Sequence, residues 1–320
     1  MSALVASEKV LGKEISFCLD EDVLVVDSNL TPASARGVLA EIRKLTNKPV
    51  RYVVNSHQHS DHIYGNQVYQ DAFPQVDFIA QSNMREAFLK EIPQGLKDFI
   101  DSSRKTITEG TESLATGKKK MGEALTEKEK KSLASEIELL KKYLPEFEKI
   151  RPVAPTLTVE KELTLHRGNR LIKFLYFGRG NTRGDLITYL PKEKILITGD
   201  LLVHPIPFAF ESYLGDWVQT LKKMRELDAD VIIPGHGPVM RNKDYLDLVT
   251  NLLETIVTQT HDSVKRGLSL EEIKKTINLE AFRVKIAGED TNLNFIFTQV
   301  FVPTAVERAY KEAKGEIERP

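Results

Sequence analysis

Residues 53–62 read Val53-Val54-Asn55-Ser56-His57-Gln58-His59-Ser60-Asp61-His62. This segment holds three of the seven histidines of the chain. Because side chains two positions apart on an extended segment point the same way, His57 and His59 can present two imidazoles to one metal ion. Asp61 and His62 follow in a turn and can face a second ion. Zinc accepts imidazole nitrogen and carboxylate oxygen, so the stretch predicts a metal centre.

The stretch fits the pattern HxHxDH, and further motifs surround it in order. They are Asp22–Asp27, which reads as a strand ending in an aspartate, then Gly65-Asn66, Gly178–Asp185 (GRGNTRGD), Ile197–Leu201 (ITGDL) and Pro234–Pro238 (PGHGP). Together they resemble the metallo-β-lactamase superfamily over roughly residues 15–240. The resemblance implies an α/β fold, a four-layered αβ/βα sandwich.

The resemblance also implies two zinc sites. The first would be held by His57, His59 and Asp200, and the second by Asp61, His62, His236 and a bridging Asp200. One or two Zn²⁺ per chain are therefore expected. Asp61 would both bind metal and orient the attacking hydroxide.

Asn181 departs from the superfamily pattern, which usually places a histidine there. An amide oxygen is neutral and a weaker zinc ligand than imidazole. Asn181 would then be a feeble ligand of the first metal or a hydrogen-bond donor near it. The second site keeps a full protein ligand set, so we expect it to bind zinc more tightly. A bacterial branch of the superfamily with a similar GRGNT motif makes Asn181 a feature of the branch.

The residues favour hydrolysis by a metal-bound hydroxide, because the sequence contains no G-x-S-x-G or other serine-nucleophile motif. The expected substrate is a small ester, thioester, lactone or amide. By resemblance, an aspartate at position 200 is unlike true β-lactamases, so β-lactam cleavage is at most a side activity. His204, four residues later, could act on the substrate as a hydrogen-bond donor or proton carrier, could serve as a replacement metal ligand, or could only pack its loop.

Two alternatives remain. One is a persulfide dioxygenase with a single iron at His57, His59 and Asp200, which would leave the second site idle. The other is a partner-binding protein without catalysis.

Composition is that of a globular enzyme, with 41% hydrophobic residues and a formal net charge of −1. Nucleic acid is therefore not an expected partner, and no apolar run predicts a membrane span. One cysteine cannot form an internal disulfide, so nothing demands an oxidising compartment. The N-terminus shows no signal peptide, so the cytoplasm is the default location. A periplasmic or secreted protein would look the same if a leader had been removed.

The predicted catalytic domain spans residues 1–240 and contains a helical insertion at 83–151. In the insertion, Thr126 with Glu129 forms a capping box, and the helix beginning there is expected to run to Ile150. Residues 110–122 read as a polar stretch, and Pro93 and Pro145 as bends or stops. The insertion is either a lid over the metal cleft or a packing and homodimerisation element. Residues 241–320 are predicted to form a C-terminal helical region packed on the same domain, with one helix over 292–313.

Overall fold

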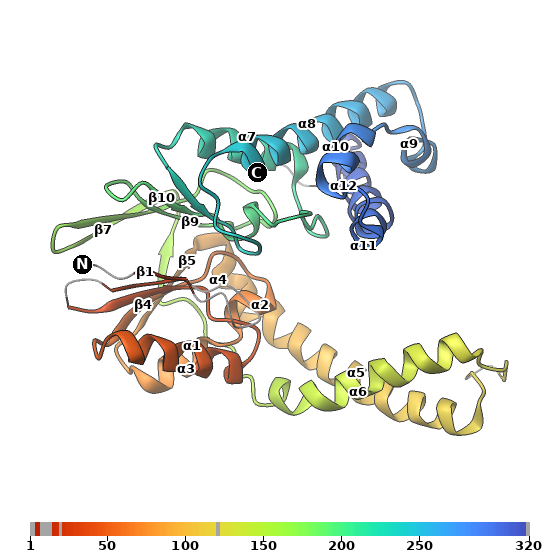
Figure 1. Cartoon of the computed structure of the whole chain (residues 1–320), viewed down its shortest axis with the longest axis horizontal. Coiled ribbons are helices and arrows are strands. Elements are labelled where there is room, and N and C mark those ends of the chain that lie inside the picture. The colour runs from red at the N-terminus through yellow and green to blue at the C-terminus, as the bar shows by residue number, and fades with distance from the viewer. Residues whose placement is uncertain (1–3, 7–14, 19–20, 120–121, 318–320) are drawn as a thin grey trace.

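The computed structural model describes residues 4–6, 15–18, 21–119 and 122–317. Two sheets face each other and are covered by helices on their outer sides, which confirms the predicted four-layered sandwich (Figure 1). The first sheet has the order β1-β2-β3-β4-β5-β6, with strands Leu4–Ala6, Ile15–Cys18, Val23–Val26, Val50–Val54, Asp77–Gln81 and Leu157–Val159. The second has the order β11-β10-β9-β8-β7, with strands Val231–Ile233, Ile195–Ile197, Ile187–Leu190, Arg170–Leu175 and Glu162–Arg167.

Strand β3 shows why the sheets are layered. All four of its residues are buried, and they alternate between two hydrophobic clusters. Leu24 and Val26 face the cluster between the sheets, while Val23 and Val25 face the helices outside. Successive side chains of a strand point to opposite faces, so an uninterrupted apolar strand must be covered on both sides. β3, β4, β5 and β6 pair in parallel, as expected for such buried strands.

Helices α1 (Pro32–Leu45) and α3 (Asn66–Ala72) cover the first sheet, and α7 (Leu214–Glu226) and α8 (Asp244–Lys265) cover the second (Figure 1). The Thr31 hydroxyl caps α1 by accepting a hydrogen bond from the backbone N–H of Ser34, with Pro32 at the first helical position. The cluster under α7 and α8 extends to α9 (Leu270–Thr276) and α12 (Val302–Ala313). The C-terminal helices therefore share a core with the second sheet.

The insertion forms α4 (Ser82–Leu89), α5 (Glu91–Thr116) and α6 (Glu127–Phe147), and α5 and α6 project from the sandwich as a long hairpin (Figure 1). The Thr126–Glu129 capping box is confirmed. The polar stretch at 110–122 is helical as far as Thr116. Gly110 packs there against α6, because an added Cβ would lie 2.8 Å from Ile137 Cδ1.

The prolines of the insertion interrupt its helices less than expected. The chain breaks at Lys90, and Pro93 lies in the first turn of α5, where its missing N–H costs nothing. Pro145 lies inside α6, which ends two residues later at Phe147.

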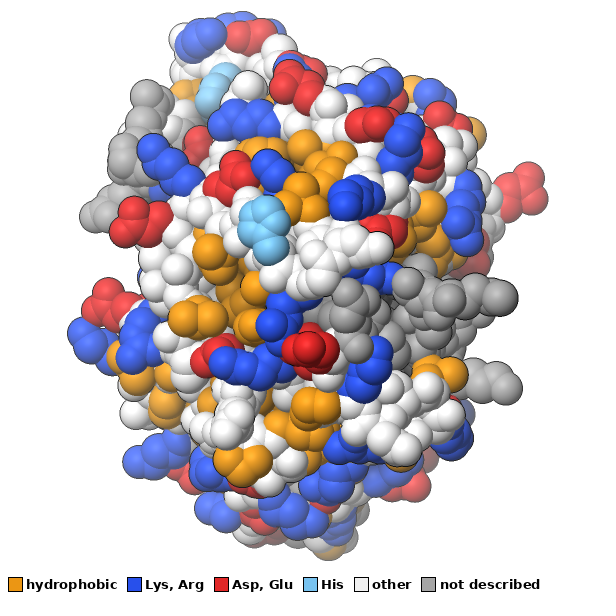
Figure 2. Space-filling view, turned by 90° about the vertical axis from the view of Figure 1, so that its left-hand side faces the viewer, with side chains coloured by type: hydrophobic (Ala, Val, Ile, Leu, Met, Phe, Trp, Pro, Cys, Tyr) orange, Lys and Arg blue, Asp and Glu red, His pale blue; other side chains and the backbone are white. Residues whose placement is uncertain are grey.

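The helix expected over 292–313 is confirmed, and it contains a π-helical segment. The structure has α11 (Thr291–Phe295), a π-helical segment (Ile296–Phe301) and α12, preceded by α10 (Glu280–Ile286). No helix in the described ranges is long and apolar enough to cross a membrane. The face in Figure 2 intersperses acidic and basic side chains with hydrophobic ones, in line with the near-zero net charge of the chain.

Candidate metal centre

The carboxyl ends of three strands deliver the predicted ligands to one place. β4 ends at Val54 and leads into the HxHxDH loop, whose last part forms the short helix α2 (Ser60–Ile63). β10 leads into a 3₁₀ turn, Gly199–Leu201, that carries Asp200, and β11 leads into the loop of His236. β10 and β11 run parallel, so these two loops leave the second sheet side by side.

Asp61, His62 and His236 form the second ligand group. Their ligand atoms lie within 4.8 Å of one another. His236 Nε2 lies 3.0 Å from Asp61 Oδ2, and His62 Nε2 lies 3.4 Å from the same oxygen. These are the spacings expected of atoms that share one metal ion at about 2.0–2.2 Å each.

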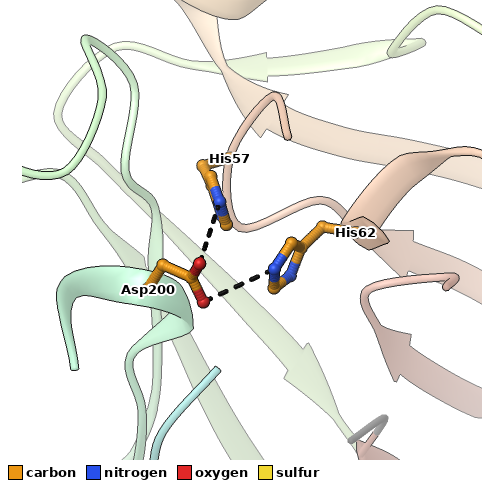
Figure 3. A group of neighbouring side chains, drawn as sticks. All are labelled: His57, His62 and Asp200. Atoms are coloured by element: carbon orange, nitrogen blue, oxygen red, sulfur yellow. Dashed lines mark ion pairs between the residues drawn. The ribbon is translucent and has the colours of Figure 1, made fainter. Parts of the chain in front are cut away.

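The first ligand group comprises His57, His62 and Asp200, whose ligand atoms lie within 4.8 Å of one another, while the expected ligand His59 lies outside this group and beside His57. His57 Nε2 lies 2.9 Å from His59 Nδ1 and 3.6 Å from Asp200 Oδ2. The other oxygen of the same carboxylate, Asp200 Oδ1, lies 3.4 Å from His62 Nε2 and 3.5 Å from His236 Nε2. Figure 3 shows Asp200 between His57 and His62, with one oxygen toward each. The carboxylate therefore has the position of a bridge between two ions.

Unsatisfied buried atoms show that the residues fit a metal. His62 Nε2 and Asp200 Oδ1 are buried and have no hydrogen-bond partner among the described residues. Leaving such polar atoms unpaired in the interior costs about 1–3 kcal/mol each. Both atoms point into the ligand groups, so a cation bound there would satisfy them together.

The electrostatics of the site keep both carboxylates ionised. Burial opposes ionisation of Asp200, but His62 and His57 outweigh it and hold the pKa of the carboxyl below its usual value. Burial likewise opposes ionisation of Asp61, but the adjacent imidazoles of His236 and His62 outweigh it and lower the pKa of the carboxyl strongly. Burial and the nearby His62 lower the pKa of His57 well below its usual value. His57 therefore stands as a neutral imidazole and Asp200 as an anionic carboxylate, the forms in which each binds metal. Burial opposes protonation of His62, but Asp200 and Asp27 outweigh it and raise its pKa well above the usual value.

Asp27, at the end of β3, connects the two ligand groups from behind. It has a left-handed backbone conformation, with φ of 63°. Its Oδ2 lies 2.8 Å from His62 Nδ1 and accepts a hydrogen bond from Ser56 Oγ at 2.8 Å. Ser56 Oγ in turn lies 3.0 Å from His57 Nδ1. Hydrogen bonds to both Nδ1 atoms leave the Nε2 atoms of His57 and His62 free to bind metal.

Two glycines allow the loops to approach each other. An added Cβ at Gly235 would lie 2.0 Å from Asp200 Oδ1, and one at Gly65 would lie 1.8 Å from the backbone oxygen of Ser28. Neither position can hold a larger residue without movement of the site or of the loop behind it.

Asn181 is buried, and its Nδ2 has no hydrogen-bond partner among the described residues. Its loop is held by Asp185, which accepts hydrogen bonds from the N–H and the hydroxyl of Thr182 at 2.8 and 3.1 Å. Burial raises the pKa of Asp185 to about 7. Asn181 thus has a free amide donor. Both predicted roles, weak ligand of the first metal and hydrogen-bond donor near it, are compatible with this position.

His204 is not among the two ligand groups. Its ring is exposed and packs against Tyr245 at 4.9 Å between centroids, and its backbone N–H donates to the carbonyl of His236 at 3.0 Å. The contacts place His204 beside the His236 loop, as a neighbour of the metal centre.

Glu211 was not singled out from the sequence. Its Oε2 lies 3.8 Å from His59 Nε2 and accepts a hydrogen bond from Gln58. It lines a pocket of about 200 Å³ next to the HxHxDH loop, together with residues of that loop and of the insertion: Gln58, His59, Ser60, Ala87, Glu91 and Ile92. No local pattern marks a lone glutamate 152 positions from its histidine, so the signal exists only in the folded chain.

Comparison with known proteins supports the assignment of the fold. The sequence profile of the metallo-beta-lactamase superfamily matches residues 17–236, so the chain belongs to that superfamily. A linear primary-alkylsulfatase of Pseudomonas sp. (strain ATCC 19151) is 23% identical over 276 residues, which are 81% of this chain and 48% of the relative.

Solved structures show the same architecture. The stereoselective inverting sec-alkylsulfatase Pisa1 from Pseudomonas sp. superposes with a TM-score of 0.64 at 18% identity, over 94% of this chain and 47% of that protein. The metallo-beta-lactamase from Pontibacter korlensis gives 0.51 at 16% identity, over 79% of this chain and 93% of that protein. The chain spans about half the length of the alkylsulfatases that it matches.

Proposed function

We propose that this protein is a zinc-dependent hydrolase with two metal ions, acting on a small ester, thioester, lactone or amide. The observation that carries the proposal is the position of Asp200, whose two oxygens face different ligand groups. Two zinc ions at such a site supply Lewis acidity and lower the pKa of bound water toward neutrality. Asp61 faces both His62 and His236 and is placed to orient the attacking water.

Among esters, alkyl sulfates are the first class to test, because the relative that matches 81% of this chain is an alkylsulfatase. The pocket beside His59 supports an apolar substituent, since Ala87 and Ile92 are among the residues that line it.

The test is a panel of alkyl sulfates, thioesters, lactones and β-lactams, assayed with zinc-loaded protein and with Asp61→Ala as a matched control. We expect zinc-dependent turnover of at least one ester class that disappears in the variant. Equal turnover by the variant would place the chemistry elsewhere.

The iron-dependent persulfide dioxygenase remains the second candidate. It would use His57, His59 and Asp200, and the group of Asp61, His62 and His236 would then bind no metal. That second group is compact, with His236 and Asp61 only 3.0 Å apart, and it therefore favours two metals. Metal analysis of natively loaded protein separates the two: iron at one equivalent, with oxygen consumption on a persulfide substrate, would replace our proposal.

For the insertion, the structure supports a role as a wall of the site, because Ala87, Glu91 and Ile92 at its base line the pocket. Homodimerisation through the projecting hairpin stays a proposal. Leu139 on α6 is 57% exposed and offers an apolar contact for a second copy. Light scattering of the parent and of Leu139→Glu tests it: a dimer that dissociates in the variant is expected, and a monomeric parent would exclude it.

A further inference from the structure

His59 lies between a metal-binding neighbour and a carboxylate. Its Nδ1 is 2.9 Å from His57 Nε2, on the side of the first ligand group. Its Nε2, on the opposite side of the ring, is 3.8 Å from Glu211 Oε2. A neutral imidazole carries one N–H, and the hydrogen bond that it makes decides which nitrogen is free for a metal.

Glu211 is held in place although its side chain is 58% exposed. Gln58 Nε2 donates to its Oε2 at 3.1 Å. The backbone is held from the C-terminal helix α12, where Arg308 donates to the carbonyls of Ser212 at 2.6 Å and of Glu211 at 3.1 Å. The carboxylate is therefore fixed beside His59 by contacts from two other parts of the chain.

We infer that Glu211 is a positioning residue for the first metal: its carboxylate faces His59 Nε2 at 3.8 Å, favours the tautomer that carries the proton on Nε2, and so keeps Nδ1 free to bind zinc. The inference rests on the metal centre proposed above. Carboxylates that accept the second N–H of a metal-bound histidine fix the ring and increase its basicity. The orientation and basicity of His59 matter more here than in a three-histidine site, because Asn181 occupies the position at which a third imidazole would bind the metal.

Zinc titration of metal-free protein against a competing chelator tests this directly, comparing the parent with Glu211→Ala, Glu211→Gln and Glu91→Gln. Loss of such a partner typically weakens metal binding by about 10–100-fold, and we expect that loss for the first metal in Glu211→Ala with the second metal unchanged. Glu211→Gln should lose less, because its amide oxygen still accepts a hydrogen bond. Glu91 lines the same pocket but pairs with Arg183 at 2.6 Å, so Glu91→Gln should leave the affinity for the first metal unchanged.

Nuclear magnetic resonance of the zinc-loaded proteins provides a readout that a merely structural role would not change. The Nε2 proton of His59 should exchange slowly with water in the parent and quickly in Glu211→Ala. An affinity for the first metal within twofold of the parent in Glu211→Ala, or an equal loss in Glu91→Gln, would overturn the role of Glu211 alone. A parent that binds no zinc at either group would overturn the metal centre as well.

Discussion

Replacing Asp27 with Asn should weaken both metals, the second more than the first. The substitution keeps the size of the side chain but puts an amide NH₂ or a neutral oxygen where a carboxylate meets His62 Nδ1 and Ser56 Oγ, each at 2.8 Å. If the NH₂ takes the Oδ2 position, His62 must accept at Nδ1 and carry its proton on Nε2, which faces Asp200 and Asp61. In that tautomer Nε2 cannot bind a metal.

The magnitude follows from the lost hydrogen bond. A hydrogen bond to a charged group contributes about 1.5–3 kcal/mol, and a factor of ten in affinity corresponds to about 1.4 kcal/mol. The second metal should therefore bind about 10–100-fold more weakly, in line with other partners of metal-bound histidines. The matched control is Ser56→Ala, which removes the hydroxyl between Asp27 and His57 but keeps the contact of Asp27 with His62, and should weaken the first metal more than the second.

The assay is competitive zinc titration of both variants, with circular dichroism to show that they fold. The reasoning is refuted if Asp27→Asn binds both zinc ions within twofold of the parent, or if Ser56→Ala weakens the second metal as much as the first.

Other substitutions test other parts of the site. Asp61→Ala should keep the fold and reduce turnover by several orders of magnitude, measured on the best substrate of the panel; a loss of only a few-fold would remove Asp61 from the catalytic centre. Asn181→His should strengthen binding of the first metal, because imidazole replaces a weakly donating amide. Zinc stoichiometry at limiting zinc and turnover, measured on the same preparation, would show whether activity falls at the same time. Unchanged stoichiometry would mean that residue 181 does not face the metals. Gly235→Ala should displace Asp200, since the new Cβ would lie 2.0 Å from Oδ1, and should lower zinc stoichiometry below that of the parent; full zinc binding in this variant would contradict the bridging position of the carboxylate.

Those parts of the centre that depend on neighbouring residues could be predicted from the sequence. His57, His59, Asp61 and His62 lie within six positions, and the strand before them fixes where they emerge. Asp200 and His236 could be placed only through their resemblance to superfamily motifs, since nothing local distinguishes them.

Contacts between distant segments could not be predicted. Glu211 meets His59, and Arg308 holds the loop of Glu211 from a helix 97 positions away. The sequence identified residues 110–122 only as polar, and the packing of buried Gly110 against Ile137, which supports the second half of α5, could not be predicted from it. Tertiary packing decided that helix, where local composition suggested a polar stretch.

Anomalous diffraction at the zinc edge, recorded on zinc-loaded crystals before and after partial chelation, tests the two-metal centre most directly. Our account predicts two zinc peaks about 3.5–4 Å apart, one on each side of Asp200. After partial chelation, the peak beside Asp61, His62 and His236 should remain while the peak beside His57 and His59 disappears. A single peak that persists only at His57 and His59 would contradict it.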